Sequence, residues 1–190
     1  MLATKKDVDF LILRCQQGEL AAFTDLFRMH ETQVYRLAIT ILHNEQDAED
    51  VVQDVFLRIF QQINRYQGKS SFKTWLTTIV VNTCRDRLRR KKVRKAFSLD
   101  WIRGHASDQD VAQEVSERQD TQQLWSCVNQ LDDKLRIPLI LHYHERISCD
   151  EIGQILGVKT STIYARLNKA RKQLRATYQE SLPDVESQLR

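Results

Sequence analysis

The sequence predicts an all-α protein with two small helical domains, an N-terminal helical bundle and a C-terminal helix-turn-helix domain, joined by a flexible linker. Three observations support this fold class. The 190 residues include only five glycines and two prolines, so few positions break a helix. Apolar residues recur with the spacing of helices, and few stretches alternate between apolar and polar residues as strands do. With 42% apolar residues, the chain can form the core of one domain or of two small ones.

Three helical patterns occupy the first half of the chain. They run from about Asp9 to Ile41, from Asp47 to Tyr66 and from Phe72 to about Lys95. Together they would form one bundle, so we expect the first domain to span residues 1–95.

The second of these patterns is acidic on one side. Asn44 and the acids after it could cap a helix and oppose its dipole. Apolar residues, including Phe60 and Ile63, occupy one half of the helical wheel, whereas Leu57 falls in the other half among acids and amides. An exposed leucine with such neighbours resembles a docking site for a basic protein partner, although single exposed leucines are also common.

The third pattern has an apolar face and an opposite polar, cationic face. The apolar face holds Leu76, Ile79, Val80, Cys84 and Leu88, and the opposite face holds Thr78, Asn82, Arg85 and Arg89. The helix ends in residues 85–95, RDRLRRKKVRK, which contain eight Lys or Arg and one Asp. Arg and Lys neutralise phosphates and Asn can bond base edges, so this face suits nucleic-acid binding. A solvated basic surface helix is the alternative.

The helical pattern breaks between residues 96 and 118. This polar and acidic segment contains Gly104 with several Ser and Asp, and it is typical of a linker that Trp101 and Ile102 could partly order. We expect the second domain to span residues 119–180, with a C-terminal tail at 181–190. Its core is predicted to begin at helical spacing, with Leu124, Val128 and Leu131.

The segment DEIGQILGVKTSTIYARLNKARKQL, residues 150–174, has the pattern of a helix-turn-helix. Gly153 lets another helix cross closely, Gly157 can take the left-handed conformation at the break, and Thr160 is a plausible N-cap of the second helix. Small and polar residues lead the exposed face of that helix and bases follow. This order suits a recognition helix that enters the major groove; an ordinary helical hairpin is the alternative.

Charge is distributed unevenly along the chain, although the net charge is only +4. Residues 45–54 hold five Asp or Glu and no base, whereas residues 152–179 hold six Lys or Arg and no acid. Separate acidic and basic surfaces imply separate partners.

Several classes of protein do not fit the sequence. The apolar runs are too short for a membrane span and the N-terminus lacks a signal-peptide core, so we expect a cytoplasmic chain without membrane insertion. The four cysteines form no CxxC pair, which favours reduced, mostly buried thiols. His142, His144 and Cys149 would point different ways on a helix, so neither a metal nor another cofactor is expected.

Three motifs, in this order and spacing, closely resemble the extracytoplasmic-function (ECF, group IV) sigma factors of bacterial RNA polymerase, in the sigma-70 family. They are DAEDVVQDVFLRIF, then SSFKTWLTTIVVNTCRDRLRRKK, then the helix-turn-helix after LDDKLRIPLILHYHERIS. The resemblance covers nearly the whole chain. It implies that the first domain binds the polymerase clamp and the minus-ten promoter element, and that the last domain binds the minus-thirty-five element and the polymerase flap.

The resemblance also implies which residues make the contacts in the first domain. The core-polymerase contacts would be Asp47, Asp50, Gln53, Asp54, Leu57, Arg58 and Gln61. The loop from Gln67 to Ser71 would pocket a flipped base next to Asn82. The full minus-ten set would be Gln67, Gly68, Lys69, Ser70, Ser71, Phe72, Thr78, Asn82, Arg85, Arg89, Arg90 and Lys91. Phe72 and Trp75 could stack on bases, but Trp75 fits a core position better.

In the second domain the resemblance implies a set of contacts on the recognition helix. The minus-thirty-five set would be Lys159, Thr160, Ser161, Thr162, Tyr164, Ala165, Arg166, Lys169, Arg171 and Lys172. Tyr164 departs from the family, in which many members carry Lys or Arg, so the family's usual upstream sequence is in doubt for this chain.

The expected function is therefore that of a sigma factor, which directs promoter recognition, strand opening and transcription initiation without chemistry of its own. An anti-sigma factor is expected as a further partner by resemblance. A stand-alone regulator that binds duplex DNA as a dimer is the alternative, but it leaves the acidic helix and the Asn82 face unexplained. An enzyme built on a helical bundle would need inward-facing carboxylates or histidines, such as paired Glu-x-x-His motifs, and the sequence has none.

Overall fold

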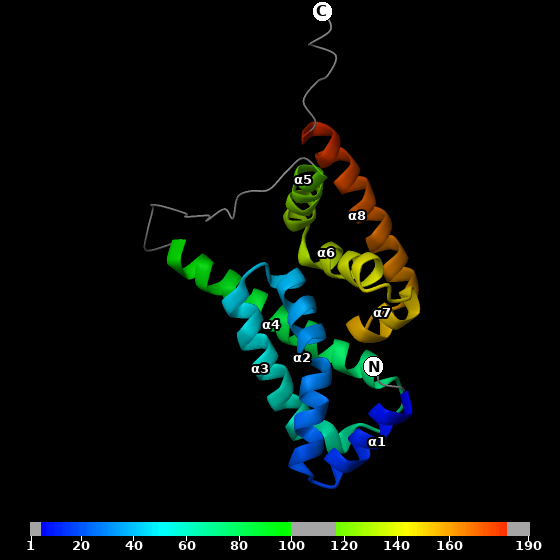
Figure 1. The fold of residues 1–190 in the computed structure, drawn as a ribbon. Helices are drawn as coiled ribbons and strands as arrows, with labels where there is room; N and C mark the ends of the chain where they lie inside the picture. The colour runs from blue at the N-terminus through cyan, green and yellow to red at the C-terminus, as the bar shows by residue number, and fades with distance from the viewer. Residues whose placement is uncertain (1–4, 100–116, 182–190) are drawn as a thin grey trace, which may run out of the picture. The chain divides into compact units, whose positions relative to one another are not determined.

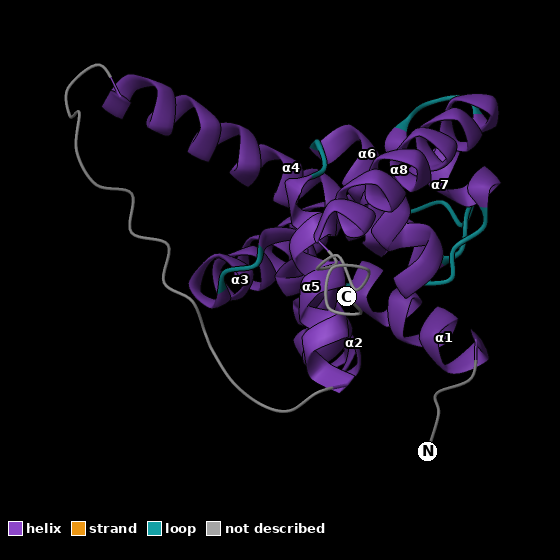
Figure 2. Cartoon of the chain, turned by 90° about the horizontal axis from the view of Figure 1, so that it is seen from above, coloured by secondary structure: helices purple, strands orange, loops and turns teal. Residues whose placement is uncertain are grey.

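The computed structural model describes residues 5–99 and 117–181. In these ranges all regular elements are helical, which confirms the predicted all-α class (Figures 1 and 2). The chain divides into two compact units, Met1–Arg103 and Gly104–Arg190. Most of the predicted linker and all but the first residue of the predicted C-terminal tail lie outside the described residues.

Among residues 5–99, the first unit contains four α-helices and one 3-10 turn. They are α1 (Lys5–Gln16), α2 (Leu20–Leu42), α3 (Glu45–Gln62), η1 (Ile63–Arg65) and α4 (Phe72–Leu99). Helices α2, α3 and α4 pack against one another, and α1 packs against α2 (Figure 1). The core of this unit includes side chains that are no more than 1% exposed, namely Leu26, Ile41, Val51, Val55, Ile59 and Leu76.

The helical pattern predicted from about Asp9 to Ile41 forms two helices, α1 and α2, instead of one. The chain breaks between α1 and α2 at Gly18, whose φ of 86° lies in the left-handed region that only glycine adopts without strain. Arg14 of α1 and Glu19, just before α2, pair across this break, with 2.8 Å between Nε of Arg14 and Oε2 of Glu19. The apolar spacing continues through the turn, and for that reason periodicity alone did not reveal it.

Helix α3 begins as the sequence predicted. The side chain of Asn44 caps it by accepting a hydrogen bond of 2.9 Å from the backbone N–H of Asp47. Glu45 and Asp47 lie in its first turn, where negative charge stabilises the helix dipole.

The described part of the second unit, residues 117–181, contains four α-helices and one π-helical turn. They are α5 (Glu117–Gln130), α6 (Asp133–Leu139), η2 (Ile140–His144), α7 (Cys149–Leu156) and α8 (Thr160–Ser181). Helices α5, α6 and α7 each pack against α8. Val128 and Leu131 are buried as predicted, but Leu124 is 45% exposed. Cys127, which is 3% exposed, is buried beside Val128 in α5.

No helix in the two described ranges is both long enough and apolar enough to cross a membrane. The four cysteines, Cys15, Cys84, Cys127 and Cys149, are free thiols, and all four are buried as predicted.

Candidate nucleic-acid and protein interfaces

The outer face of α3 carries exposed apolar side chains. Leu57 is 60% exposed, which confirms the prediction that it lies outside the core. Phe60, which the helical wheel placed in the apolar half, is also 53% exposed. Its ring packs edge-on against Phe23 of α2, with 5.1 Å between ring centroids, so Phe60 lies at the edge of the core rather than inside it. Leu57 and Phe60 lie one turn apart along α3, and together they form an exposed apolar surface.

Most of the predicted core-polymerase contacts surround this apolar surface. Gln53 and Gln61 are exposed, whereas Asp50, Asp54 and Arg58 are half-buried. The guanidinium of Arg58 lies 3.8 Å from the carboxylate of Asp86 on α4. The outer face of α3 therefore combines apolar, acidic and amide groups, the chemistry expected of a surface that binds a basic protein partner.

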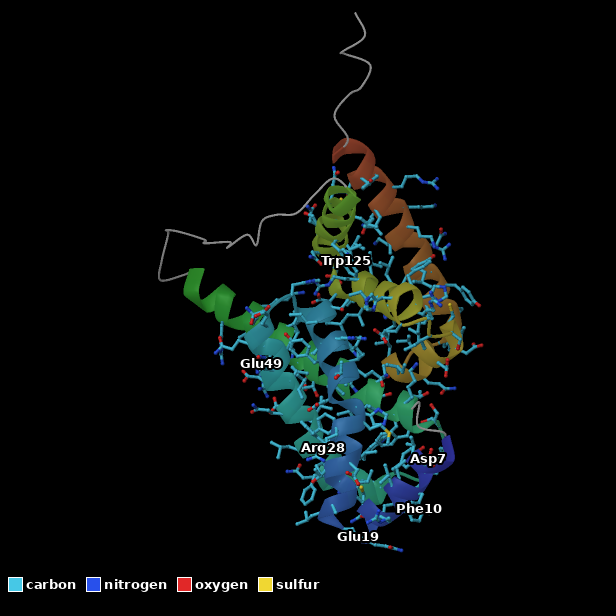
Figure 3. The ribbon with its side chains drawn as sticks, viewed as in Figure 1. Asp7, Phe10, Glu19, Arg28, Glu49 and Trp125 are labelled. Carbon is cyan, nitrogen blue, oxygen red and sulfur yellow. The ribbon has the colours of Figure 1, made fainter. Side chains whose placement is uncertain are left out.

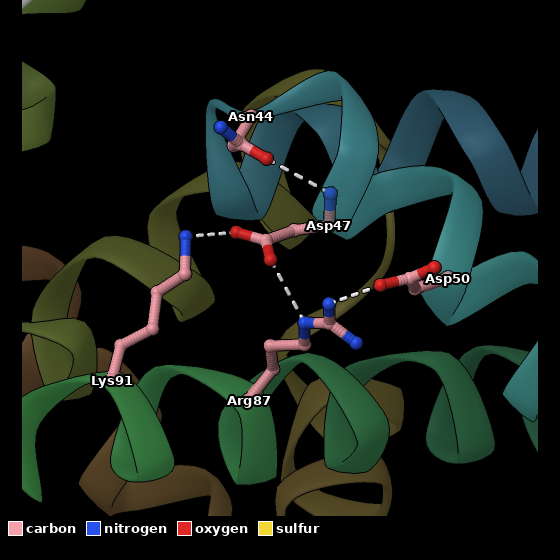
Figure 4. Close-up of polar contacts among 5 residues, drawn as sticks. All are labelled: Asn44, Asp47, Asp50, Arg87 and Lys91. Carbon is pink, nitrogen blue, oxygen red and sulfur yellow. Dashed lines mark hydrogen bonds and ion pairs between the residues drawn. The ribbon is translucent and has the colours of Figure 1, made fainter. Parts of the chain in front are cut away.

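Asp47 does not belong to that exposed face, which corrects the sequence prediction. It is only 6% exposed, and its carboxylate points at α4 (Figure 4). Arg87 donates a hydrogen bond of 2.9 Å from Nε to Oδ1 of Asp47, and Lys91 forms an ion pair with Oδ2. The other end of the Arg87 guanidinium pairs with Asp50. Asp47 is buried because its carboxylate neutralises two cations where α3 and α4 pack together.

The charges around Asp47 decide its protonation. Burial alone would raise the pKa of Asp47, but the hydrogen bonds from Lys91 and Arg87 and the two positive charges outweigh burial. The pKa of this carboxyl is therefore held below its ordinary value, and Asp47 is ionised at neutral pH.

Lys91, predicted to contact minus-ten DNA, has its ammonium directed at Asp47 instead. Arg87 and Lys91 continue the buried stripe of Val80 and Cys84 at spacings of three and four residues along α4. This continuation was a signal in the sequence that could have assigned both cations to the inner side of the helix.

The outer face of α4 remains polar and cationic as predicted. Asn82, Arg85, Arg89 and Arg90 are exposed. Thr78 is half-buried, and its hydroxyl donates a hydrogen bond of 2.8 Å to the carbonyl oxygen of Thr74. On this face, Nη2 of Arg89 lies 3.3 Å from the carboxylate of Asp86. Because Arg89 is 77% exposed, water and salt screen this pair and Arg89 can exchange partners.

The loop before α4 is exposed and held at its two ends. Gln67, Gly68, Lys69 and Ser71 are exposed, and Ser70 is half-buried. The hydroxyl of Tyr66 donates a hydrogen bond of 2.8 Å to the carbonyl oxygen of Ser70. The Oγ of Ser71 accepts one of 3.1 Å from the backbone N–H of Thr74 in the first turn of α4.

Phe72 is not available to stack on a base, which is a second correction. It is 5% exposed, and its ring packs against His30, Tyr66 and Trp75 at centroid distances of 5.3, 5.8 and 5.7 Å. Trp75 is half-buried in the same aromatic cluster. These rings fix the position of the loop relative to α4 instead of presenting a flat surface to solvent.

The second unit contains a helix-turn-helix formed by α7 and α8. Ser148 and Glu151 form a capping box at the start of α7, and Gly157 ends that helix with a φ of 65°. The predicted N-cap, Thr160, is the first residue of α8, and its hydroxyl donates a hydrogen bond of 2.8 Å to Asp150 of α7. This bond joins the two helices at the turn.

The predicted minus-thirty-five residues share one side of α8 and the turn before it. Ile163, Leu167 and Ala170 are fully buried on the opposite side. The exposed residues are Lys159, Ser161, Tyr164, Ala165, Lys169, Arg171 and Lys172, and the half-buried ones are Thr160, Thr162 and Arg166.

One aromatic neighbour of this surface was not predicted. The ring of Tyr143, from the π-helical turn η2, lies 5.9 Å from the guanidinium carbon of Arg171. Tyr143 is 55% exposed, so the contact lies at the surface and adds an aromatic group beside the cations of α8. No local sequence pattern indicated this contact, because it depends on how η2 and α8 pack.

Comparison with known proteins matches both units to one family. Residues 26–94 match Sigma-70 region 2, and residues 121–174 match Sigma-70, region 4. The chain belongs to the ECF branch of the sigma-70 family. This sigma factor is 34% identical over 161 residues to the ECF RNA polymerase sigma factor SigE of Mycolicibacterium smegmatis, covering 84% of this chain but only 62% of SigE. It is 28% identical over 173 residues to SigW of Bacillus subtilis, covering 86% of this chain and 92% of SigW.

Two solved structures have the same fold as this ECF sigma factor. One is CnrH in complex with the cytosolic domain of CnrY, with a TM-score of 0.66, 23% identity, and coverage of 91% of this chain and 97% of CnrH. The other is the sigma factor RpoE in complex with the anti-sigma factor NepR from Bartonella quintana, with a TM-score of 0.65 and 24% identity. It covers 84% of this chain and 98% of RpoE.

Proposed function

We propose that this ECF sigma factor binds core RNA polymerase and directs promoter recognition, strand opening and transcription initiation, with no catalytic site of its own. The observation that carries the proposal is the exposed Leu57 on an acidic helix, within a chain that also presents two cationic helix faces. A stand-alone DNA-binding regulator requires only the cationic faces and leaves the α3 surface unexplained.

The polymerase clamp would bind the outer face of α3. Burying an exposed leucine contributes about 1.5–3 kcal/mol, and the surrounding acids select a basic partner. The proposed contacts are Asp50, Gln53, Asp54, Leu57, Arg58 and Gln61, and we add the exposed Phe60.

The minus-ten element would bind the outer face of α4 and the loop before it. Extruding a base costs a few kcal/mol, which a basic helix face and a shaped loop can offset. Asn82 can bond a base edge while the neighbouring arginines hold the phosphates. The proposed contacts are Gln67, Gly68, Lys69, Ser70, Ser71, Thr78, Asn82, Arg85, Arg89 and Arg90.

The minus-thirty-five element would bind α8, with the start of the helix in the major groove and its later cations on phosphates. The proposed contacts are Lys159, Thr160, Ser161, Thr162, Tyr164, Ala165, Arg166, Lys169, Arg171 and Lys172. Tyr164 is 60% exposed near the start of the helix, so we propose that it affects which base pairs are preferred there.

Two weak DNA contacts become one strong contact when one chain holds both and polymerase positions them. The flap of polymerase would hold the second unit, while residues 96–118 span between the two domains. Because RpoE was solved with an anti-sigma factor and has the same fold, we propose that an anti-sigma factor also controls this chain. This activity would take place in the cytoplasm.

Run-off transcription tests the proposal. Core polymerase lacking a sigma factor is mixed with the full-length chain and a library of promoter fragments, and the start sites are sequenced. We expect transcripts from a small set of fragments that share two spaced elements. We also expect tight, salt-sensitive promoter binding only when core polymerase is present. No gain of start-site choice, or equal promoter affinity with and without core polymerase, would contradict the proposal.

A further inference from the structure

The basic end of α4 divides into an inner and an outer set of cations. Arg87 and Lys91 lie one turn apart on the side that faces α3, and both pair with the carboxylate of Asp47 (Figure 4). Arg85, Arg89 and Arg90 are exposed. The side chain of Lys91 is also 49% exposed, so Arg87 and Lys91 differ from the outer cations by their pairing with the buried carboxylate of Asp47 and not by burial alone.

The inner pairs are protected from exchange with phosphate. Asp47 is only 6% exposed, so water and salt screen its carboxylate less than they screen an exposed acid, while the side chains of Arg87 and Lys91 are themselves 27% and 49% exposed. A phosphate that captured either cation would leave a buried carboxylate with one of its partners lost, which is unfavourable. The exposed pair between Arg89 and Asp86 carries no such penalty, because solvent can replace either partner.

We propose that Asp47 is a positioning residue that withholds Arg87 and Lys91 from the DNA backbone and confines DNA contact on α4 to the outer face. The consequence concerns specificity. Sequence-independent affinity rises with each phosphate contact, whereas discrimination comes from the base contacts expected of Asn82. Holding two cations back lowers non-specific binding without removing a base contact. The inference rests on the proposed binding of DNA by α4.

The experiment measures binding of the full-length chain to a short labelled duplex of random sequence at several salt concentrations. The slope of log affinity against log salt counts phosphate contacts, at about 0.9 for each. Asp47→Asn is expected to steepen the slope by about 0.9, because it removes the counter-charge of Lys91, whereas Arg87 still pairs with Asp50. Glu49→Gln is the matched control, since Glu49 is an exposed acid on the same helix (Figure 3). We expect this control to leave the slope unchanged.

A second comparison does not require Asp47→Asn to be fully stable. Lys91→Gln in the otherwise wild-type chain is expected to leave the slope unchanged, whereas Arg90→Gln should reduce it by about 0.9. In the Asp47→Asn background, Lys91→Gln should also reduce the slope by about 0.9, because Lys91 is then available to phosphate. A loss of folding alone would not produce this dependence on the background.

Three outcomes would overturn the inference. They are equal slopes for wild type and Asp47→Asn, equal steepening by Asp47→Asn and Glu49→Gln, and equal losses from Lys91→Gln and Arg90→Gln in the wild-type background. Each of these can occur while wild type still binds DNA with a clear salt dependence, in which case the proposed function stands. Salt-independent binding by wild type would instead contradict DNA binding by α4, and the inference with it.

Discussion

The backbone N–H of Val158 donates a hydrogen bond of 2.9 Å to the carbonyl oxygen of Gly153, and the carbonyl oxygen of Val158 folds back over the same glycine. A Cβ added to Gly153 would lie 2.9 Å from that oxygen. Since the oxygen belongs to the backbone, it cannot move aside without shifting the turn between α7 and α8. The turn of the helix-turn-helix therefore depends on the absence of a side chain at this position.

Gly153→Ala is expected to destabilise the second unit. Forcing a methyl group into this contact should lower the free energy of unfolding by about 1–3 kcal/mol. Thermal unfolding followed by circular dichroism measures the change. Gln154→Ala is the control, because Gln154 is exposed on the same helix. Equal melting temperatures for Gly153→Ala and wild type would mean that the turn can relax.

Leu57→Arg is expected to abolish transcription while the fold stays intact. The substitution removes an apolar contact and places a cation opposite a basic partner, which should cost about 2 kcal/mol or more of binding to core polymerase. Binding of core polymerase and run-off transcription measure the effect. Leu20→Arg is the matched control, because Leu20 is 68% exposed on α2 and lies outside the proposed contacts. If both variants lost transcription equally, the result would contradict the proposal that core polymerase binds the α3 surface at Leu57.

Asn82→Ala is expected to impair strand opening more than promoter binding. The change leaves the charge of α4 unaltered but removes a side chain that can bond a base edge, a loss of about 1–3 kcal/mol. Permanganate reactivity of unpaired thymines measures opening, and filter binding measures affinity. Asn64→Ala is the control, since Asn64 is exposed in η1 and is not among the proposed DNA contacts. Normal opening by Asn82→Ala would exclude Asn82 as a base contact.

Acid is expected to remove the stability that Asp47 contributes. The pKa of Asp47 is lower in the folded chain than its ordinary value of 3.8. The ionised carboxylate therefore contributes its full stabilisation of the fold at pH values above 3.8. It is lost as the pH falls through the folded pKa, when the carboxyl is protonated and its ion pairs break. Urea unfolding at a series of pH values should show the gap between wild type and Asp47→Asn narrowing below about pH 4. If the difference in free energy of unfolding between wild type and Asp47→Asn stayed constant into strong acid, the result would contradict ion pairing by an ionised Asp47.

Cys84 is expected to resist alkylation in the folded chain. Burial raises the pKa of its thiol to about 12, so almost no thiolate is present near neutral pH. Timed labelling with iodoacetamide, read by mass spectrometry, should show slow modification of Cys84 in buffer and rapid modification in urea. Equal rates in the two solvents would mean that α4 opens readily from the bundle.

Much of the candidate site could be predicted because it depends on local features. The position of Leu57 among acids and amides indicated its exposure, and the capping role of Asn44 followed from its place before the acidic helix. Gly157 has the left-handed conformation expected at the turn. Helical spacing and the conformational freedom of glycine are properties of a few neighbouring residues, so they can be recognised without knowledge of the rest of the fold.

The remaining features depend on which helices meet. Phe72 was expected at a DNA surface and is buried among three aromatic rings, and Leu124 was expected in the core and is exposed. Asp47 and Lys91 both carry charges typical of a surface, yet they pair at the contact between α3 and α4.

The helical class, the order of the motifs and the polar and apolar faces of each helix could all be recognised from the amino-acid sequence. The packing of α3 against α4 determines which cations of α4 pair with Asp47, namely Arg87 and Lys91. The physical reason is that helical periodicity defines a direction around one helix, whereas burial of a charge depends on a partner from another helix, 40 residues earlier in the case of Arg87 and Asp47.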